Sequence, residues 1–131
     1  MSQSPFELDP AIREQLERFR EAHQDDAVGD VAHRLLFEDE RVKIWDMRLA
    51  PGEGSPLHRH EHDYYLVMQE GDMIAGISPE SEETPPFAMS LPPGGATVGI
   101  PRGALEWSVN TGQETFYELV IELKKPGNGT P

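Results

Sequence analysis

The sequence predicts an all-β domain that carries one amphipathic helix near its N-terminal end. After Gly29, short apolar runs alternate with turn-forming residues, and no second helical pattern follows. The 131 residues are enough for the core of one ordinary domain and too few for two. Because no helices separate the strands, we expect an antiparallel sandwich or barrel and not an α/β sheet.

The helix is predicted over residues 9–23. Asp9 can accept hydrogen bonds from free amides at the start of the helix, and Pro10 has no amide that needs a partner. Ile12, Leu16 and Phe19 then recur at helical spacing between charged residues, which predicts a narrow apolar stripe laid on the outside of the domain. We divide the chain into a leader and helix (1–30), a β-barrel (31–124) and a flexible tail (125–131).

Eight strands are predicted, over residues 33–37, 41–49, 63–69, 73–77, 87–91, 96–100, 105–110 and 115–123. In the strand 105–110, Trp107 and Val109 alternate with polar residues that include Glu106, so the polar face is expected to look into the barrel mouth. The core is predicted to contain Trp45, Met47 and Leu49. Tyr65 and Val67 are predicted to face a second layer or a partner subunit.

Composition excludes several classes of function. The formal net charge of −13, from 24 acidic and 11 basic residues, disfavours nucleic acid and anionic membrane partners. Without cysteine, the chain can hold a metal only through nitrogen and oxygen atoms. The first ten residues lack the pattern of a signal peptide, and no apolar run approaches the ~20 residues of a membrane span. The expected location is the cytoplasm.

A row of histidines is the strongest functional signal. His58, His60, His62 and Tyr64 are spaced two apart, so on an extended strand they would point to the same face. Such a row is typical of a metal site on a strand. His62 is either a further ligand or a histidine at the rim that faces water.

The spacing around this row resembles the first motif of the cupin family. Gly52 is followed by five residues, then by His58 and His60 as a His-x-His pair, by Tyr64 after three more residues, and by Gly71 after another six. Tyr64 occupies the position of the cupin glutamate. A shifted register that pairs His60 with His62 fails to match the spacing to Gly71.

A second segment resembles the second cupin motif. Gly95 is followed by five residues and then by Pro101, Gly103 completes the Pro-x-Gly unit, and Glu106 and Asn110 follow at the motif spacing. Glu106 occupies the position of the cupin histidine. Two motifs in tandem are a far more specific signal than a lone His-x-His.

The resemblance implies a small cupin-type, jelly-roll-like β-barrel that holds one divalent transition metal (Fe, Mn, Ni, Co or Zn) in its mouth. His58 and His60 match the cupin ligands directly, and Glu106 is the candidate third ligand. Tyr64 is a candidate ligand or acid–base group, because a nearby cation favours the phenolate. In the opposing interpretation, Glu106 forms a salt bridge with Arg59 or Arg102 and Tyr64 is a core residue.

The expected function is that of a metal-dependent small-molecule enzyme, a dioxygenase, lyase or isomerase, acting on a small organic acid or a sugar-like compound. Two alternatives stay open. One is a ligand-binding cupin with a degenerate, metal-free site, and the other is an assembly partner that uses its outer sheet. The resemblance also implies a homodimer, for which Tyr65, Trp45 and the N-terminal helix are candidate contacts.

Overall fold

The computed structural model describes residues 8–124, which contain one helix and nine strands. The elements are α1 (Pro10–Ala22), β1 (Arg34–Glu38), β2 (Val42–Leu49), β3 (His58–Arg59), β4 (Asp63–Glu70), β5 (Met73–Ile77), β6 (Phe87–Ser90), β7 (Ala96–Ile100), β8 (Leu105–Val109) and β9 (Phe116–Leu123). Every predicted strand is present, with ends that differ from the prediction by at most one residue. Most of the predicted leader and the whole predicted tail lie outside the described residues.

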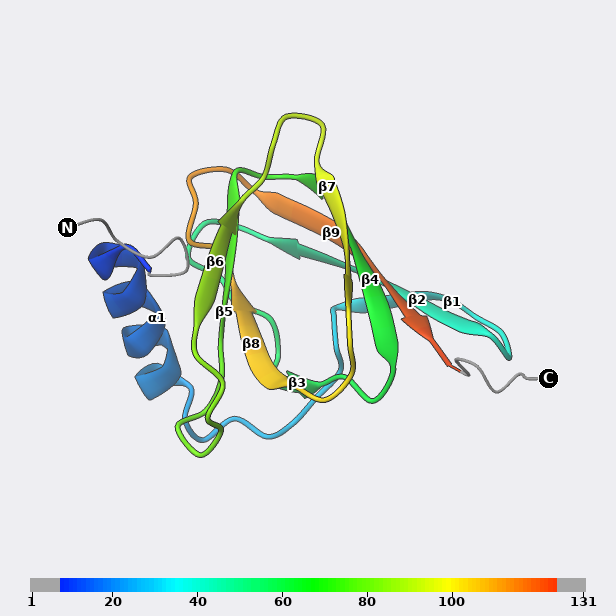
Figure 1. Cartoon of the computed structure of the whole chain (residues 1–131), viewed down its shortest axis with the longest axis horizontal. Coiled ribbons are helices and arrows are strands. Elements are labelled where there is room, and N and C mark those ends of the chain that lie inside the picture. The colour runs from blue at the N-terminus through cyan, green and yellow to red at the C-terminus, as the bar shows by residue number, and fades with distance from the viewer. Residues whose placement is uncertain (1–7, 125–131) are drawn as a thin grey trace.

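The strands form two antiparallel sheets that enclose the interior of the domain (Figure 1). The five-stranded sheet has the order β1-β2-β9-β4-β7, and the four-stranded sheet has the order β3-β8-β5-β6. β9 lies between β2 and β4 and pairs with both over almost its full length. The predicted all-β antiparallel class is therefore confirmed.

Helix α1 covers the outer face of the four-stranded sheet (Figure 1). Its N-cap is Asp9, whose Oδ1 accepts a hydrogen bond from the backbone N of Ala11 at 2.8 Å. Leu16 is fully buried and packs with Trp107 and Val109 of β8. The apolar stripe thus binds the sheet from outside, as predicted. The described helix has 13 residues and is not long and apolar enough to cross a membrane.

The main core lies on the inner face of the five-stranded sheet. Trp45, Met47 and Leu49 are 7%, 1% and 0% exposed, which confirms their predicted place in the core. Trp45 therefore cannot serve as a surface contact for a second copy of the chain. Gly95 has φ +89°, and a Cβ there would lie 2.1 Å from the carbonyl oxygen of Met68, so this position admits only glycine.

The histidine row does not lie on one strand, so that part of the prediction is wrong. His58 belongs to the short strand β3, which was not predicted, whereas Tyr64 belongs to β4 in the other sheet. The chain changes sheets at His60, whose backbone pairs with Ala104 and Gly103 through hydrogen bonds of 3.3 and 2.9 Å. A bend at His62 follows. A two-residue strand is too short to show an alternating pattern in the sequence.

Candidate metal centre

Strand register places His58 beside Glu106. The two residues are Cα partners in the antiparallel pair β3–β8, so their side chains leave the sheet on the same face. The residue that follows β8 is also anchored by hydrogen bonds. The side-chain nitrogen of Asn110 donates to the carbonyl oxygens of Leu49 and Glu114, at 3.0 and 2.9 Å.

One nitrogen of His58 is fixed by the backbone. Nδ1 lies 2.8 Å from the carbonyl oxygen of Pro56, an acceptor, so this contact assigns the ring proton to Nδ1. The other nitrogen, Nε2, then carries a lone pair. The side chain is 2% exposed, and the lone pair is therefore available inside the barrel and largely shielded from solvent. A backbone carbonyl that orients a metal-binding histidine in this way is a recurrent arrangement.

His60 contributes a second imidazole. Its ring lies 4.8 Å from the His58 ring, centroid to centroid, with an angle of 86° between the planes. The residue is 3% exposed, and its Nδ1 is buried without a hydrogen-bond partner in the described part of the chain. A buried polar atom without a partner is costly, and a bound cation is one way to satisfy it.

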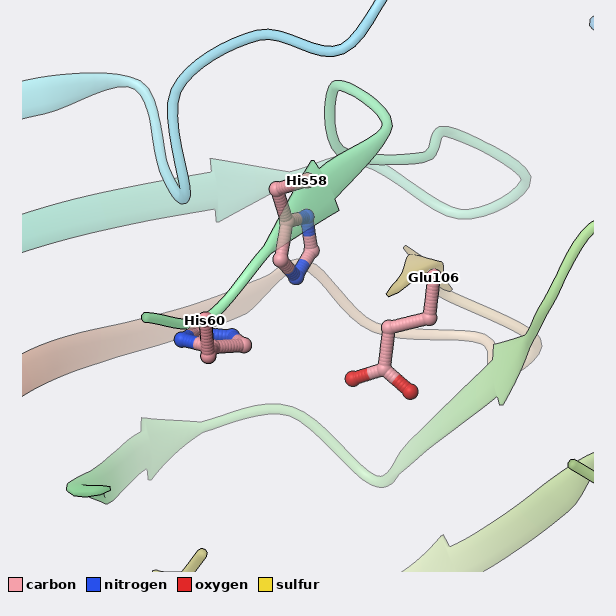
Figure 2. A group of neighbouring side chains, drawn as sticks. All are labelled: His58, His60 and Glu106. Carbon is pink, nitrogen blue, oxygen red and sulfur yellow. The ribbon is translucent and has the colours of Figure 1, made fainter. Parts of the chain in front are cut away.

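The side chains of His58, His60 and Glu106 converge on one space (Figure 2). One ligand atom from each lies within 4.8 Å of the others. Figure 2 shows the lower nitrogen of His58 and the carboxylate of Glu106 directed toward this space, with His60 beside it. Two imidazoles and one carboxylate are a donor set that divalent transition metals accept, so the residues present fit such an ion.

The electrostatic state of the two histidines suits metal binding. Burial, followed by the proximity of His58, lowers the pKa of His60 to about 3. Burial also lowers the pKa of His58, although its hydrogen bond to Pro56 opposes this shift. Both rings are therefore neutral near pH 7 and present lone pairs instead of protons.

Glu106 behaves differently from an exposed carboxylate. Burial raises its pKa to about 7, because the charged form is poorly solvated inside the barrel. The alternative in which Glu106 forms a salt bridge is not seen among the described residues. Arg59 instead contacts Glu82 at 3.8 Å and donates to the carbonyl oxygen of Gly103, and Arg102 is exposed.

Tyr64 lies face to face with His60. The ring centroids are 3.5 Å apart and the planes differ by 11°, so the tyrosine ring fixes the plane of the imidazole. Tyr64 is 3% exposed. Burial, with smaller contributions from nearby carboxylates, raises the pKa of its hydroxyl above the ordinary range. Its role as a ligand or acid–base group stays a prediction.

His62 is not part of the cluster. It follows the turn out of β3 and lines a separate cavity of about 210 Å³. The walls of this cavity include Lys43, Arg59 and Glu61, and Trp45 and Glu122 also contribute. A larger cavity of about 740 Å³ lies outside the barrel, between α1 and residues 79–81, away from the three candidate ligands.

Two further acids in the interior were not predicted. Glu118 and Glu122 are 3% and 4% exposed and lie on the inner face of β9. In the sequence this face is the less apolar one, because the outward positions of β9 are Tyr117, Leu119 and Ile121. Alternation alone therefore indicates the wrong face as the core. The signal that could have found these acids is the pair of glutamates spaced four apart on a strand.

No protein-family model matches the chain. Auxin-binding protein 1 of Arabidopsis thaliana is 29% identical over 97 residues, which are 73% of this chain and 49% of that protein. Auxin-binding protein T85 of Nicotiana tabacum is 24% identical over 99 residues, 73% of this chain and 52% of that protein. The chain thus spans about half the length of these curated relatives.

Two small solved structures match this chain over almost their whole length. A cupin domain from Bordetella pertussis superposes with a TM-score of 0.58 at 25% identity, covering 73% of this chain and 99% of that one. An RmlC-like protein with a double-stranded β-helix, from Methanocaldococcus jannaschii, gives a TM-score of 0.56 at 19% identity. That match covers 94% of this chain and 92% of the other.

Proposed function

Because this chain is a cupin by fold, we propose that it binds one divalent transition metal through His58, His60 and Glu106 and uses it to bind a small organic acid. The observation that carries the proposal is the convergence of these three side chains in the barrel interior. The two neutral imidazoles and the carboxylate suit Fe, Mn, Ni, Co and Zn.

The described residues supply three candidate ligands, so a bound transition metal would keep open positions for a further ligand. When bound, such a metal supplies Lewis-acid chemistry or, for redox-active ions, chemistry with oxygen. The residues of the chain hold the geometry around it. The Pro56 carbonyl orients His58, Tyr64 orients His60, and burial keeps competing water away.

A carboxylate is the ligand group that we propose for this centre. The two curated relatives are named as auxin-binding proteins, and auxin is a small organic acid. The described interior contains the buried acids Glu118 and Glu122 and no buried lysine or arginine, so a carboxylate ligand would be held through the bound dication itself.

Binding measurements with and without metal test this function. Metal-free and metal-loaded protein would be titrated calorimetrically with auxin, with a smaller carboxylic acid and with a neutral sugar. We expect the acids to bind only the loaded protein. Equal binding of the acids to metal-free protein would favour the alternative of a metal-free ligand-binding cupin. Oxygen uptake in the loaded protein with bound acid would separate an oxygenase from a binder, lyase or isomerase.

Substitutions of Tyr64 test whether its ring or its hydroxyl supports metal binding. If its ring acts by stacking on His60, Tyr64→Phe is expected to keep the metal affinity within about threefold, whereas Tyr64→Leu weakens it by about tenfold or more. Calorimetric titration with Co²⁺ measures both variants. An equal loss in both would instead make the hydroxyl a ligand.

We also propose that two copies of the chain associate through the outer face of the five-stranded sheet. Helix α1 covers the other sheet, but on this face no element within residues 8–124 covers the apolar side chains of β2, β4 and β9, which are Ile44, Tyr65, Val67, Leu119 and Ile121. The neighbouring edge strand β1 adds Leu35, Leu36 and Phe37, which are 44%, 44% and 51% exposed.

The occupant that we propose for this face is a second copy, because an antiparallel approach of two β1 edges brings their exposed apolar residues together. The charges at the ends of β1 are already paired within the chain, Arg34 with Asp46 and Glu38 with Lys124, so they do not oppose this approach. Light scattering is expected to give twice the mass of one chain, and a Phe37→Arg, Tyr65→Arg double variant should be monomeric. Arg18→Glu, on the exposed face of α1, is the matched control. A monomeric wild type at tens of micromolar would refute the dimer.

A further inference from the structure

Ser55 is a buried serine, 4% exposed, whose hydroxyl both accepts and donates a hydrogen bond. Its Oγ accepts from the backbone N of Ser108 at 2.9 Å and donates to the carbonyl oxygen of Pro56 at 2.9 Å. Ser108 belongs to β8, the strand of Glu106, and Pro56 precedes β3, the strand of His58. The hydroxyl therefore links the two segments that carry candidate metal ligands.

The segment before β3 contains one residue more than the part of β8 that it pairs with. Gly54 pairs with Val109 in an isolated bridge, whereas His58 pairs with Glu106. From Gly54 to His58 the chain advances by four residues, and from Val109 to Glu106 it advances by three. One residue is therefore extra, as in a β-bulge, and such bulges redirect the side chains that follow them.

The extra residue decides which side chain lies opposite Glu106. If the register of the Gly54 bridge continued, Leu57 would be the partner of Glu106 and His58 would point to the other face, because neighbouring residues on a strand alternate. Leu57 instead packs with Leu16 of helix α1, on the outer side of the sheet. His58 and Glu106 point into the same interior space (Figure 2). The candidate metal centre thus depends on the bulge.

The hydroxyl of Ser55 takes the place of a backbone acceptor at this bulge. The backbone N of Ser55 donates to the carbonyl oxygen of Ser108 at 2.7 Å, and the return bond from the N of Ser108 is accepted by the hydroxyl. The carbonyl oxygen of Pro56, which accepts from the same hydroxyl, lies 2.8 Å from Nδ1 of His58. One side chain therefore satisfies a backbone amide at the bulge and holds the carbonyl that orients His58.

We propose that Ser55 is a positioning residue of the metal centre. Its hydroxyl holds the bulge that places His58 opposite Glu106, and it fixes the Pro56 carbonyl that keeps the ring proton of His58 on Nδ1. The lone pair of Nε2 then stays directed into the interior. Ser55 acts through His58 and needs no contact with the ion. This inference rests on the proposed metal function.

Calorimetric titration of metal-free protein with Co²⁺ tests the proposal without any assay of activity. Ser55→Ala is expected to weaken Co²⁺ binding by about tenfold or more, whereas Ser55→Thr keeps the hydroxyl and should stay within about threefold of wild type. Thr111→Val is the matched control, because it removes a buried hydroxyl that has no hydrogen-bond partner in the described part of the chain. Its affinity should stay within about twofold. Ser55→Cys keeps the shape with a weaker hydrogen-bonding atom, so a smaller loss is expected there if Ser55→Ala is unstable.

Nuclear magnetic resonance of metal-free protein labelled with ¹⁵N-histidine gives a readout that a loss of stability alone would not move. Wild type is expected to show His58 with its proton on Nδ1, and Ser55→Ala to show in addition the form protonated on Nε2. A Ser55→Ala variant that melts at a lower temperature but keeps both the Co²⁺ affinity and the single form of His58 would overturn this inference alone. Absence of Co²⁺ binding in the wild type would overturn the metal function and this inference with it.

Discussion

Replacing His60 with glutamine is expected to weaken metal binding by at least about 100-fold, whereas His62→Gln leaves it within about twofold. His60 is 3% exposed beside His58 and Glu106, while His62 lies past the turn and lines a separate cavity. The two residues are spaced two apart, and an unbroken strand would have made them equivalent. Calorimetric titration of both variants with Co²⁺ measures the difference.

The fold of the two variants needs to be compared in the same experiment. Glutamine keeps most of the side-chain volume under the Tyr64 ring, so the metal-free His60→Gln variant should retain the circular dichroism spectrum of the wild type. His58→Ala is a second route to the same loss of affinity. If His62→Gln weakened binding as much as His60→Gln, the site would use the shifted His60–His62 pair instead.

Metal affinity is expected to rise with pH by about tenfold per pH unit below pH 7, and to level off above about pH 8. Glu106 binds metal as the carboxylate, and burial holds its pKa at about 7, so a proton must leave before the ion can bind. The histidines do not produce this dependence, because burial lowers the pKa of both. Titrations with Co²⁺ between pH 5.5 and 8.5 measure it. Affinity independent of pH over this range would contradict the buried state of Glu106.

The protonation of Glu106 also predicts how the stability of the metal-free protein depends on pH. Burial raises the pKa of Glu106 from 4.5 in the unfolded chain to about 7 in the folded one. The protonated carboxyl therefore contributes its full stability below pH 4.5, and this contribution is lost as the pH rises through about 7. Glu106 alone then lowers the free energy of unfolding by at most about 3 kcal/mol between pH 4.5 and pH 8. Urea denaturation with a chelator measures this decrease, and Glu106→Gln should flatten it.

The fold was predictable because its signals are local. Asp9 and Pro10 mark the start of the helix, and strands β5 and β7 have the predicted ends because turn residues bound them on both sides. The pair His58 and His60, and Glu106 from a strand more than forty residues later, were predicted from motif spacing. The structure brings these three together.

The remaining parts of the site depend on contacts between distant segments. The break of the histidine row arises because the backbone of His60 pairs with Ala104, which spacing cannot reveal. The inner face of β9 carries Glu118 and Glu122 and is less apolar than its outer face, so a rule based on hydrophobic alternation points the wrong way. Tyr64 was predicted to be near the site, but its stacking on His60 is a tertiary contact.

Elemental analysis of the untagged protein, purified without chelator, shows directly whether the chain holds a metal. We expect about one equivalent of a transition metal per chain in the wild type, either as purified or after supply of Fe, Mn, Ni, Co and Zn and removal of the excess. We expect almost none in His58→Ala treated in the same way. A wild type that retains no more metal than His58→Ala under both conditions would contradict the metal centre.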